Sequence, residues 1–353
     1  MQQSIIQPRA LQEKIDNLNK PKGSLGRLEE LAFQIGLIQQ TLSPSLRHPV
    51  HLLLGADHGI EREGVSVSPR CITWQQMENF TRGGGGVNMF CRQHGFDLRL
   101  VDMGVDHDLS SFQQILNRKV SPHGTANFLY GPAMDVQQMQ QCLDTGKELV
   151  DDALAAGSNV LAIGEMGIAN TSPSSIWMSL LLNLPLEQCV GAGAGLNDEG
   201  IRHKLNVLRR SIHHMQEVGE YQQLEGRERA LYLLRYFGGF EMAAAVGAMI
   251  YAVEQHMVLL IDGFIMSACA LIASRIVAER LPDFLDRCTF CHSGDESGHR
   301  LMLDAMGVKP LLSLGLRLGE GTGALCAYPL VDSAVRMLNE MGNFQDNKIT
   351  KYF

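Results

Sequence analysis

Short runs of consecutive apolar residues alternate with amphipathic stretches through the middle of the chain. The runs are Val50–Leu54, Leu98–Val101, Val160–Ile163 and Val258–Ile261, and their length and flanking residues are typical of buried strands. Helical spacing of apolar residues is found at Met139–Ala156, Ile176–Leu182 and Phe264–Ala278. Strands that alternate with helices predict an α/β fold, with a Rossmann-like parallel sheet flanked by helices.

Both ends of the chain have a helical pattern without strand-like runs. Leu11–Gln40 has the pattern of a helix with a break near Gly23, and Leu330–Met341 has that of a second helical segment. We therefore expect residues 48–290 to form an α/β catalytic domain. Residues 1–47 and 291–353 are expected to form a smaller helical domain built from both termini.

An acidic residue follows the end of each predicted strand. These residues are Asp57, Asp102, Glu165 and Asp262. In open parallel sheets, ligands bind in the crevice outside the carboxyl ends of the strands. Loops are polar everywhere, so single coincidences are common, but the pattern at all four strands predicts an active site at that edge.

Composition and charge narrow the class of protein. The chain has 353 residues, 45% apolar and 19% charged, with a net charge of −8. That balance argues against a protein that coats nucleic acid, which needs clustered Lys and Arg, although one small anionic ligand needs only a few donors. The N-terminus has no apolar core of a signal peptide, and no apolar run is long enough to span a membrane. With eight cysteines and no export signal, we expect reduced thiols and a cytoplasmic protein.

Two glycine-rich segments could hold a ligand. Leu318–Ala324 places Glu320 among three glycines ahead of a helical run, where backbone can approach a ligand closely; the alternative is a turn with a solvated Glu. Gly164–Pro173 could cradle a phosphate with backbone N–H groups. It is equally a capped strand-to-helix connection with Ser172 as N-cap and Pro173 at the first helical position, and both interpretations can hold together.

Two further glycine clusters are more ambiguous. Thr81–Asn88 contains four consecutive glycines, which form either a hinge or room for a flat ligand, and the polar residues nearby favour a ligand. Gly191–Gly195 resembles a dinucleotide fingerprint, but its third glycine comes one place early and almost no strand precedes it. Lys204 follows on a helical stretch, where a lysine is usually solvated. It could instead reach back to a phosphate.

Two other motifs are considered and set aside. Val258–Phe264 is superficially similar to the diphosphate-sugar motif of ordinary phosphoribosyltransferases, but it lacks a second adjacent acid to hold phosphates and Mg²⁺. Cys288–His292 has the spacing of a c-type haem site, with His299 nearby, but there is no export signal and no second CxxC. We expect reduced structural thiols, no metal and no cofactor.

Four segments in order carry a family resemblance. They are Lys20–Glu29, Ala56–Gly59 with Glu63–Pro69, Gly164–Thr171 and Leu318–Ala324. Over about residues 10–345 the chain resembles the nicotinate-nucleotide–dimethylbenzimidazole phosphoribosyltransferases, which make the lower-ligand nucleotide of cobalamin. The resemblance implies a cytoplasmic homodimer that acts on nicotinate mononucleotide and dimethylbenzimidazole without a metal, a nucleic acid or a membrane.

The resemblance also implies roles for individual residues. Glu320 corresponds to the proton acceptor of the family. The implied substrate-binding residues are Ser68, Ile72, Gln76 and Leu318 around the benzimidazole, Glu165 and Gly167 beside the nucleotide, Lys204 near its phosphate, and Gly319, which is assigned to neither substrate. One position departs from the family, because Gly294 stands where a serine is usual, and we assign no role to the segment 288–299.

The implied chemistry fits the residues on independent grounds. Nicotinate bound to ribose is a pyridinium, so it leaves as a neutral ring and needs no metal. The attacking benzimidazole must lose its N–H proton, for which one carboxylate suffices as general base. Burial would raise the pKa of that carboxylate toward neutrality. A Rossmann dehydrogenase and a non-catalytic binding protein remain the alternatives, and the preferred aromatic base is open.

Overall fold

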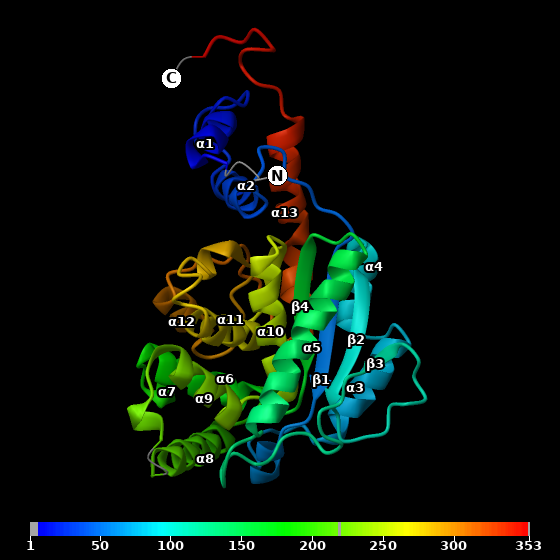
Figure 1. Ribbon diagram of the computed structural model, residues 1–353, viewed down its shortest axis with the longest axis vertical. Helices are drawn as coiled ribbons and strands as arrows, with labels where there is room; N and C mark the ends of the chain where they lie inside the picture. Colours follow the sequence, from blue (N-terminus) through cyan, green and yellow to red (C-terminus); the bar gives the residue numbers. More distant parts are fainter. Residues whose placement is uncertain (1–5, 218–219, 352–353) are drawn as a thin grey trace.

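One parallel sheet forms the centre of the molecule (Figure 1). The computed structural model describes residues 6–217 and 220–351. The strands are β1 (Val50–Ala56), β2 (Asp97–Gly104), β3 (Ile115–Asn117), β4 (Val160–Met166), β5 (Val258–Ile261) and β6 (Cys288–Phe290). Their order in the sheet is β3-β2-β1-β4-β5-β6, and every pair is parallel. The predicted α/β fold class is confirmed.

Helices cover both faces of this sheet. They are α1 (Pro8–Asp16), α2 (Arg27–Ile38), α3 (Cys71–Thr81), α4 (Gly86–His94), α5 (Val136–Ala155), α6 (Thr171–Leu182), α7 (Leu186–Cys189), α8 (Asp198–Glu217), α9 (Gly226–Phe237), α10 (Phe240–Glu254), α11 (Phe264–Ile276), α12 (His299–Ala305) and α13 (Thr322–Glu340). Short 3₁₀ turns are η1 (Gly59–Glu63), η2 (Tyr221–Gln223) and η3 (Leu285–Arg287). No helix of the described part is both long and apolar enough to cross a membrane.

The alternation of side chains along the strands separates two apolar clusters. Leu52 and Leu54 of β1 point to the face covered by α5, α6, α10 and α11, whereas Leu53 points to the face covered by α13, α4 and α2. All seven residues of β1 are buried, as expected for a central strand with helices on both faces. Because both faces are apolar, consecutive apolar residues in the sequence predicted this strand correctly.

The direction in which successive strands are added to the sheet changes at β1. The chain runs from β1 outward through β2 and β3, and then returns to place β4 on the other side of β1. Leu54 of β1 lies opposite Glu165 of β4 in the register. Neighbouring strands that leave in opposite directions open a crevice at their carboxyl ends. The fold therefore places its ligand crevice beside Glu165.

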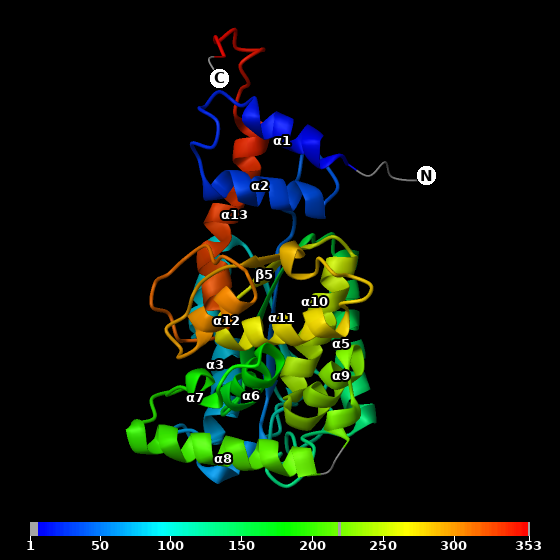
Figure 2. The same ribbon diagram turned by 90° about the vertical axis from the view of Figure 1, so that its left-hand side faces the viewer.

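The two ends of the chain meet at the narrow end of the molecule (Figure 2). Helix α2 packs against α13 and α1 packs against α2, and the buried residues of α1 and α2 include Leu11, Ile15 and Ile35. The backbone N–H of Phe344 donates to the carbonyl of Asn17 at 3.1 Å. The helices predicted at both termini are thus confirmed, whereas the domain boundaries at residues 47 and 291 stay a prediction.

Helix α13 is longer than the sequence indicated. It begins at Thr322 and not near Leu330, and Pro329 lies inside it. A proline removes one backbone hydrogen bond, which is why the sequence pattern favoured a later start. Burial of Leu325 and Val331 on the same helix outweighs that loss. The prediction also missed β3 and β6, which are three residues each and too short to show a period.

Candidate active site

A cleft of about 150 Å³ lies at the carboxyl edge of β4. Its walls include the loop that follows β4 and the segment that precedes α13. Of the residues implied in substrate binding or catalysis, those that line the cleft are Glu165, Gly167, Leu318, Gly319 and Glu320. The parallel sheet brings together two segments that lie far apart in the sequence.

Glu320 stands in a left-handed turn held against the sheet. Gly319, Glu320 and Gly321 have φ values of 78°, 62° and 78°. The ring Nε2 of His51 on β1 donates to the carbonyl of Glu320 at 3.0 Å. A Cβ at Gly164 would come within 2.2 Å of the same carbonyl, so only glycine lets the turn pack this closely. The backbone of the turn is therefore fixed by two strands.

The carboxylate of Glu320 faces the start of α4. Its Oε2 accepts the backbone N–H of Val87 at 3.1 Å, and a Cβ at Gly86 would lie 3.4 Å from the same oxygen. Burial raises the pKa of Glu320, the Val87 N–H opposes that rise, and the charge of Asp262 adds to it. Glu320 therefore has a carboxylate with raised basicity beside the cleft, which suits a general base.

Glu165 is the second carboxylate of the cleft and has different surroundings. Burial raises its pKa to about 8, the Asn170 amide opposes the rise, and the negative charge of Glu241 adds to it. The side-chain amide of Asn170 donates to its Oε2. Its Oε1 would lie 2.5 Å from a Cβ at Gly319, where φ is also positive, so this position requires glycine. At neutral pH the Glu165 carboxyl is mostly protonated.

Lys204 lies beneath the loop that follows β4. Its side chain comes from α8 and is buried, and its Nζ donates to Thr171 Oγ1 at 2.7 Å. Burial lowers its pKa to about 8. No carboxylate of the described residues forms an ion pair with Lys204. A buried cation without a protein counter-charge next to the first turn of α6 is suited to an anionic ligand.

Ser68, Ile72 and Gln76 lie on the α3 side and do not line this cleft. Gln76 Oε1 accepts a hydrogen bond from the Asn79 side chain at 3.1 Å. Asn79 in turn fills the space above Gly84, close to the start of α4. The roles of these three residues in binding the base stay a prediction.

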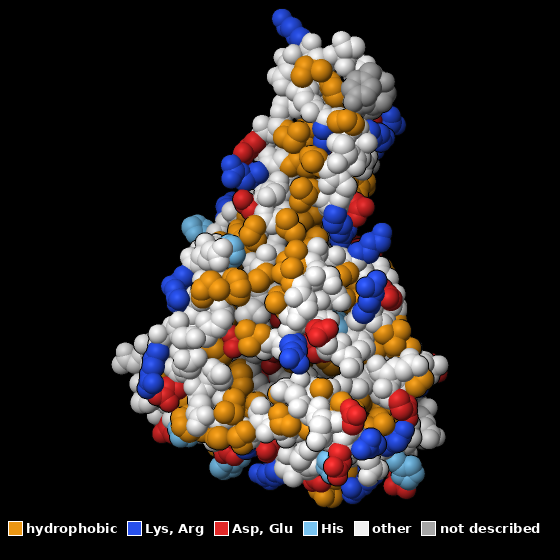
Figure 3. Space-filling view, turned by 180° about the vertical axis from the view of Figure 1, so that it is seen from behind, with side chains coloured by type: hydrophobic (Ala, Val, Ile, Leu, Met, Phe, Trp, Pro, Cys, Tyr) orange, Lys and Arg blue, Asp and Glu red, His pale blue; other side chains and the backbone are white. Residues whose placement is uncertain are grey.

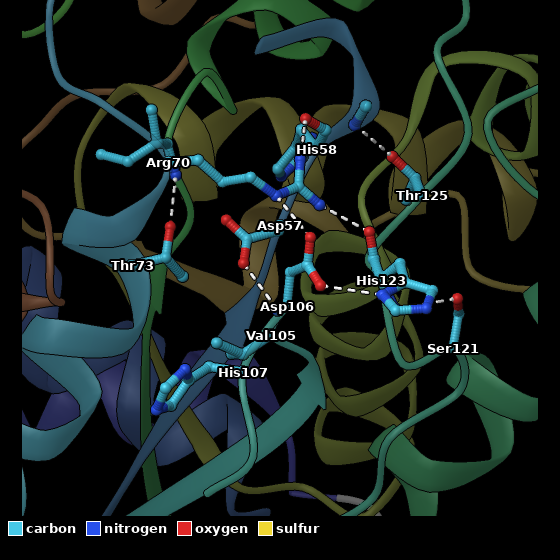
Figure 4. Close-up of polar contacts among 12 residues, drawn as sticks. Asp57, His58, Arg70, Thr73, Val105, Asp106, His107, Ser121, His123 and Thr125 are labelled. Atoms are coloured by element: carbon cyan, nitrogen blue, oxygen red, sulfur yellow. Dashed lines mark hydrogen bonds and ion pairs between the residues drawn. The ribbon is translucent and has the colours of Figure 1, made fainter. Parts of the chain in front are cut away.

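An ion-pair cluster holds the loop that follows β1 (Figure 4). Arg70 donates to Asp106 at 3.1 Å, to the carbonyl of His58 at 3.1 Å and to the carbonyl of His123 at 2.5 Å. His123 Nδ1 contacts the other oxygen of Asp106 at 2.9 Å, and the Asp106 N–H donates to Asp57 at 2.8 Å. The cluster ties this loop and the start of α3 to the loops after β2 and β3.

The acidic residues that follow the strands have different partners. The expectation that all of them form the active site was wrong. The residues concerned are Asp57, Asp102, Glu165 and Asp262. Asp102 Oδ1 accepts the N–H of Val105 at 2.8 Å, and Asp262 Oδ1 accepts the N–H of Ala324 at 3.0 Å. Buried loops and helix starts need acceptors for their free N–H groups. Only Glu165 lines the cleft; the others position loops.

The connection after β4 starts its helix earlier than expected. Asn170 is the N-cap of α6 and Thr171 is its first residue, so Ser172 and Pro173 are the second and third. Ala169 has a φ of 77°, which turns the chain sharply before the helix. The prediction that Ser172 is the N-cap was wrong, because the sharp turn at Ala169 lets the helix begin two residues earlier.

Two other glycine clusters lie close to the cleft, and Gly193 and Ala194 of the second cluster line it. A Cβ at Gly85 would meet Phe80 at 2.4 Å, and Gly86 leaves room for Leu318 and Glu320. The space beside Gly86 borders Leu318 and Glu320, so a flat ligand at this cluster stays a prediction. Gly191–Gly195 lies between α7 and α8 with no strand before it, so it lacks the setting of a dinucleotide site.

The cysteines and histidines of the segment 288–299 are buried. Cys288 and Cys291 are buried free thiols whose pKa burial raises. His292 contacts Asp262 at 3.4 Å, and His299 Nδ1 accepts the N–H of Gly294 at 2.8 Å. In the part of the chain that the structure describes, no cluster of three His, Cys, Asp or Glu could hold a metal ion. The prediction of reduced structural thiols fits these contacts.

Two residues of the cleft were missed by sequence reasoning. Glu296 and Arg317 both line it. A Cβ at Gly294 would lie 2.2 Å from Glu296 Oε2, so the Glu296 side chain occupies the space that the family serine would need. The departure at Gly294 pointed to this segment. Nothing in the sequence pattern singled out Arg317.

Comparisons with known proteins show which family the chain resembles over its length. A family model described as "Phosphoribosyltransferase" matches residues 5–349. The chain is 56% identical over 344 residues to the nicotinate-nucleotide–dimethylbenzimidazole phosphoribosyltransferase of Bacteroides fragilis, which covers 98% of this chain and 96% of the relative. The enzyme of the same name from Phocaeicola vulgatus is 57% identical, with the same coverage of both chains.

A solved structure extends the agreement to the fold. The crystal structure of CobT from Thermus thermophilus superposes with a TM-score of 0.89 at 35% identity, over 98% of this chain and 99% of that one. Sequence identity and fold agree over essentially the whole length. The chain therefore belongs to the nicotinate-nucleotide–dimethylbenzimidazole phosphoribosyltransferase family.

Proposed function

We propose that this enzyme transfers the 5-phosphoribosyl group of nicotinate mononucleotide to dimethylbenzimidazole, with Glu320 as the general base. The products are α-ribazole 5′-phosphate and nicotinate. The observation that carries the proposal is a buried carboxylate of raised pKa at the edge of the cleft, held by a backbone N–H in a fixed turn. The activity of the relatives named above supports the choice of substrates.

Glu320 removes the proton that the base must lose. One ring nitrogen of dimethylbenzimidazole attacks the anomeric carbon while the bond to the nicotinate nitrogen breaks. The electron pair of that bond returns to the pyridinium, which leaves as a neutral ring. The second ring nitrogen becomes acidic, and its proton passes to the Glu320 carboxylate.

The remaining predicted residues divide between the two substrates. Lys204 contacts the phosphate of the nucleotide, near the first turn of α6. Glu165, Gly167 and Gly319 bind its ribosyl part; the two glycines allow a close approach of backbone. The benzimidazole is bound by Ser68, Ile72, Gln76 and Leu318, of which Leu318 is 60% exposed and so has apolar surface available to a flat ring.

Mass spectrometry of the products tests the reaction. The enzyme is incubated with nicotinate mononucleotide and dimethylbenzimidazole, or with adenine or a phenol in its place. Release of nicotinate together with a ribotide of the base is the expected result. Binding of both substrates without turnover would identify a non-catalytic binding protein, and quenching of NADH fluorescence on titration would favour a dehydrogenase.

Assembly and location are further parts of this proposal. The enzyme is a homodimer in the cytoplasm. Figure 3 shows a band of hydrophobic side chains running from the narrow end onto the body of the molecule, which supports a partner surface. All eight cysteines are free, which supports a reducing compartment. Light scattering in solution measures the mass, and a monomeric mass would reject the dimer.

A further inference from the structure

The cleft contains one positively charged side chain that no other residue neutralises. Arg317 lines the cleft together with Glu165, Glu296 and Glu320, and its side chain is exposed. Among the described residues it has no hydrogen bond and no ion pair. Lysine and arginine side chains near carboxylates usually pair with them. An unpaired guanidinium in a cleft lined by three carboxylates is therefore available to a ligand.

The backbone fixes the side of the cleft on which Arg317 lies. The Asp295 N–H donates to the carbonyl of Leu316 at 2.9 Å, which holds the stretch against the segment of Glu296. The Leu318 side chain points toward α4, where it would lie 3.0 Å from a Cβ at Gly86. Arg317 and Leu318 both line the cleft, and the Leu318 side chain is the one placed beside α4.

Nicotinate mononucleotide carries two anionic groups at opposite ends. Lys204 and the first turn of α6 are suited to the phosphate. The carboxylate of the pyridine ring needs a second cation, because the other ionisable side chains that line the cleft are Glu165, Glu296 and Glu320, none of which carries a positive charge. Arg317 is the one Lys or Arg among the described residues that line the cleft. A guanidinium matches a carboxylate with two parallel hydrogen bonds.

We propose that Arg317 binds the carboxylate of the nicotinate ring and thereby selects nicotinate mononucleotide over nicotinamide mononucleotide. The inference rests on the proposed function, since it assigns a contact to the leaving group of that reaction. The ring carboxylate keeps its charge throughout the transfer, so Arg317 holds the same group before and after the glycosidic bond breaks. The amide of nicotinamide lacks that charge and gains little from the contact.

The test is a comparison of kcat/KM for the two mononucleotides in wild type, Arg317→Gln and Arg317→Lys. We expect Arg317→Gln to lose about tenfold or more with nicotinate mononucleotide, the effect of roughly one charge-assisted hydrogen bond, and to change little with nicotinamide mononucleotide. Arg317→Lys should keep part of the preference, because it retains the charge but not the paired geometry. Arg300→Gln removes a surface arginine outside the cleft and serves as the matched control.

Two outcomes would overturn the proposal. An equal loss with both mononucleotides would show that Arg317 binds the phosphate or supports the fold, because the two substrates share everything except the carboxylate. Unchanged kcat/KM values with both mononucleotides would show that Arg317 contacts neither substrate. Inhibition by free nicotinate and nicotinamide gives a second readout, and only nicotinate inhibition should weaken in Arg317→Gln. If wild type itself used neither mononucleotide, the proposed function would fail before any variant was measured.

Discussion

Glu320 and Glu165 both place a carboxyl group in the cleft, but the hydrogen-bond donors and the charges around the two groups differ. Both are almost fully buried, with 7% and 8% of their surface exposed, and both border glycine-rich backbone. Glu320 receives a backbone N–H from Val87 in the first turn of α4. Among the described residues, the donor to the Glu165 carboxyl is the side-chain amide of Asn170, and the negative charge of Glu241 adds to the rise of its pKa.

The difference shows that burial alone does not decide the protonation state of a carboxyl group. A backbone donor and the positive end of a helix favour the charged form of Glu320. For Glu165, one hydrogen bond from Asn170 opposes the effect of burial, and the carboxyl is mostly neutral below about pH 8. The cleft thus pairs a proton acceptor with a proton donor of the same residue type, as acid-base sites often do.

The sharpest test of this comparison is the pair Glu320→Gln and Glu165→Gln. Glutamine cannot take a proton, so we expect kcat of Glu320→Gln to fall by about 10² to 10⁴ while dimethylbenzimidazole still binds. Glu165→Gln should change kcat by less than about tenfold at neutral pH, because an amide resembles a protonated carboxyl. Steady-state kinetics and base titration measure both. Equal losses in the two variants would reject the division of roles.

The pH profile of the same pair provides the control. The wild-type rate should fall at acid pH, as Glu320 becomes protonated at a pH above the usual range of a glutamate pKa. It should fall again above about pH 8, as Glu165 ionises. The acid limb should disappear from the residual activity of Glu320→Gln, and the alkaline limb should disappear from Glu165→Gln.

A smaller effect is expected from Lys204→Ala, which acts on the nucleotide half of the cleft. A hydrogen bond to a charged group contributes roughly 1.5–3 kcal/mol. The KM for nicotinate mononucleotide should therefore rise about tenfold or more, since about 1.4 kcal/mol is a factor of ten. Isothermal titration with dimethylbenzimidazole alone should show unchanged affinity. Weaker binding of the base with normal binding of the nucleotide would contradict the assignment.

Val87→Pro tests the donor that distinguishes Glu320 from Glu165. Val87 is the second residue of α4, where proline is tolerated because that N–H has no partner within the helix. Removing the donor should raise the pKa of Glu320 further, because the N–H stabilises the charged carboxylate. The acid limb of the rate should move to higher pH. Val87→Ala keeps the N–H and should leave the limb in place, with any loss confined to thermal stability.

Substitution of both Cys288 and Cys291 by Ser should keep kcat within a few-fold of wild type. The thiols pack away from the cleft, where Cys291 donates to a backbone carbonyl of its own segment. Circular dichroism separates a folding defect from a loss of catalysis. A collapse of activity in a normally folded variant would show that the thiols take part in the reaction.

Exhaustive chelation with EDTA should produce no change in rate. A neutral pyridine leaves in the proposed reaction, so no metal is needed to neutralise a charged leaving group. Activity that vanished in EDTA and returned with zinc or magnesium would contradict this prediction.

The sequence predicted those features that depend on local pattern. Buried strands such as β1 and β4 show as apolar runs because helices cover both faces, and the family resemblance identified Glu320. Contacts between segments that lie far apart in the sequence could not be predicted from local patterns. The donor from Val87 exists only because the segment before α13 meets α4, and the unpaired state of Arg317 is visible only once the residues around the cleft are placed. The strand-end carboxylates were recognised, but their different partners lie in loops far along the chain.

The backbone at Glu320 gives a separate way to locate function. A non-glycine residue with positive φ costs on the order of 1 kcal/mol, and glycine would relieve that strain. The turn before α13 uses glycine on both sides of Glu320 but keeps a glutamate between them. Ala169 has the same conformation across the cleft. On both walls of the cleft, a residue other than glycine therefore has a backbone conformation that favours glycine. Such conflicts tend to occur at functional sites.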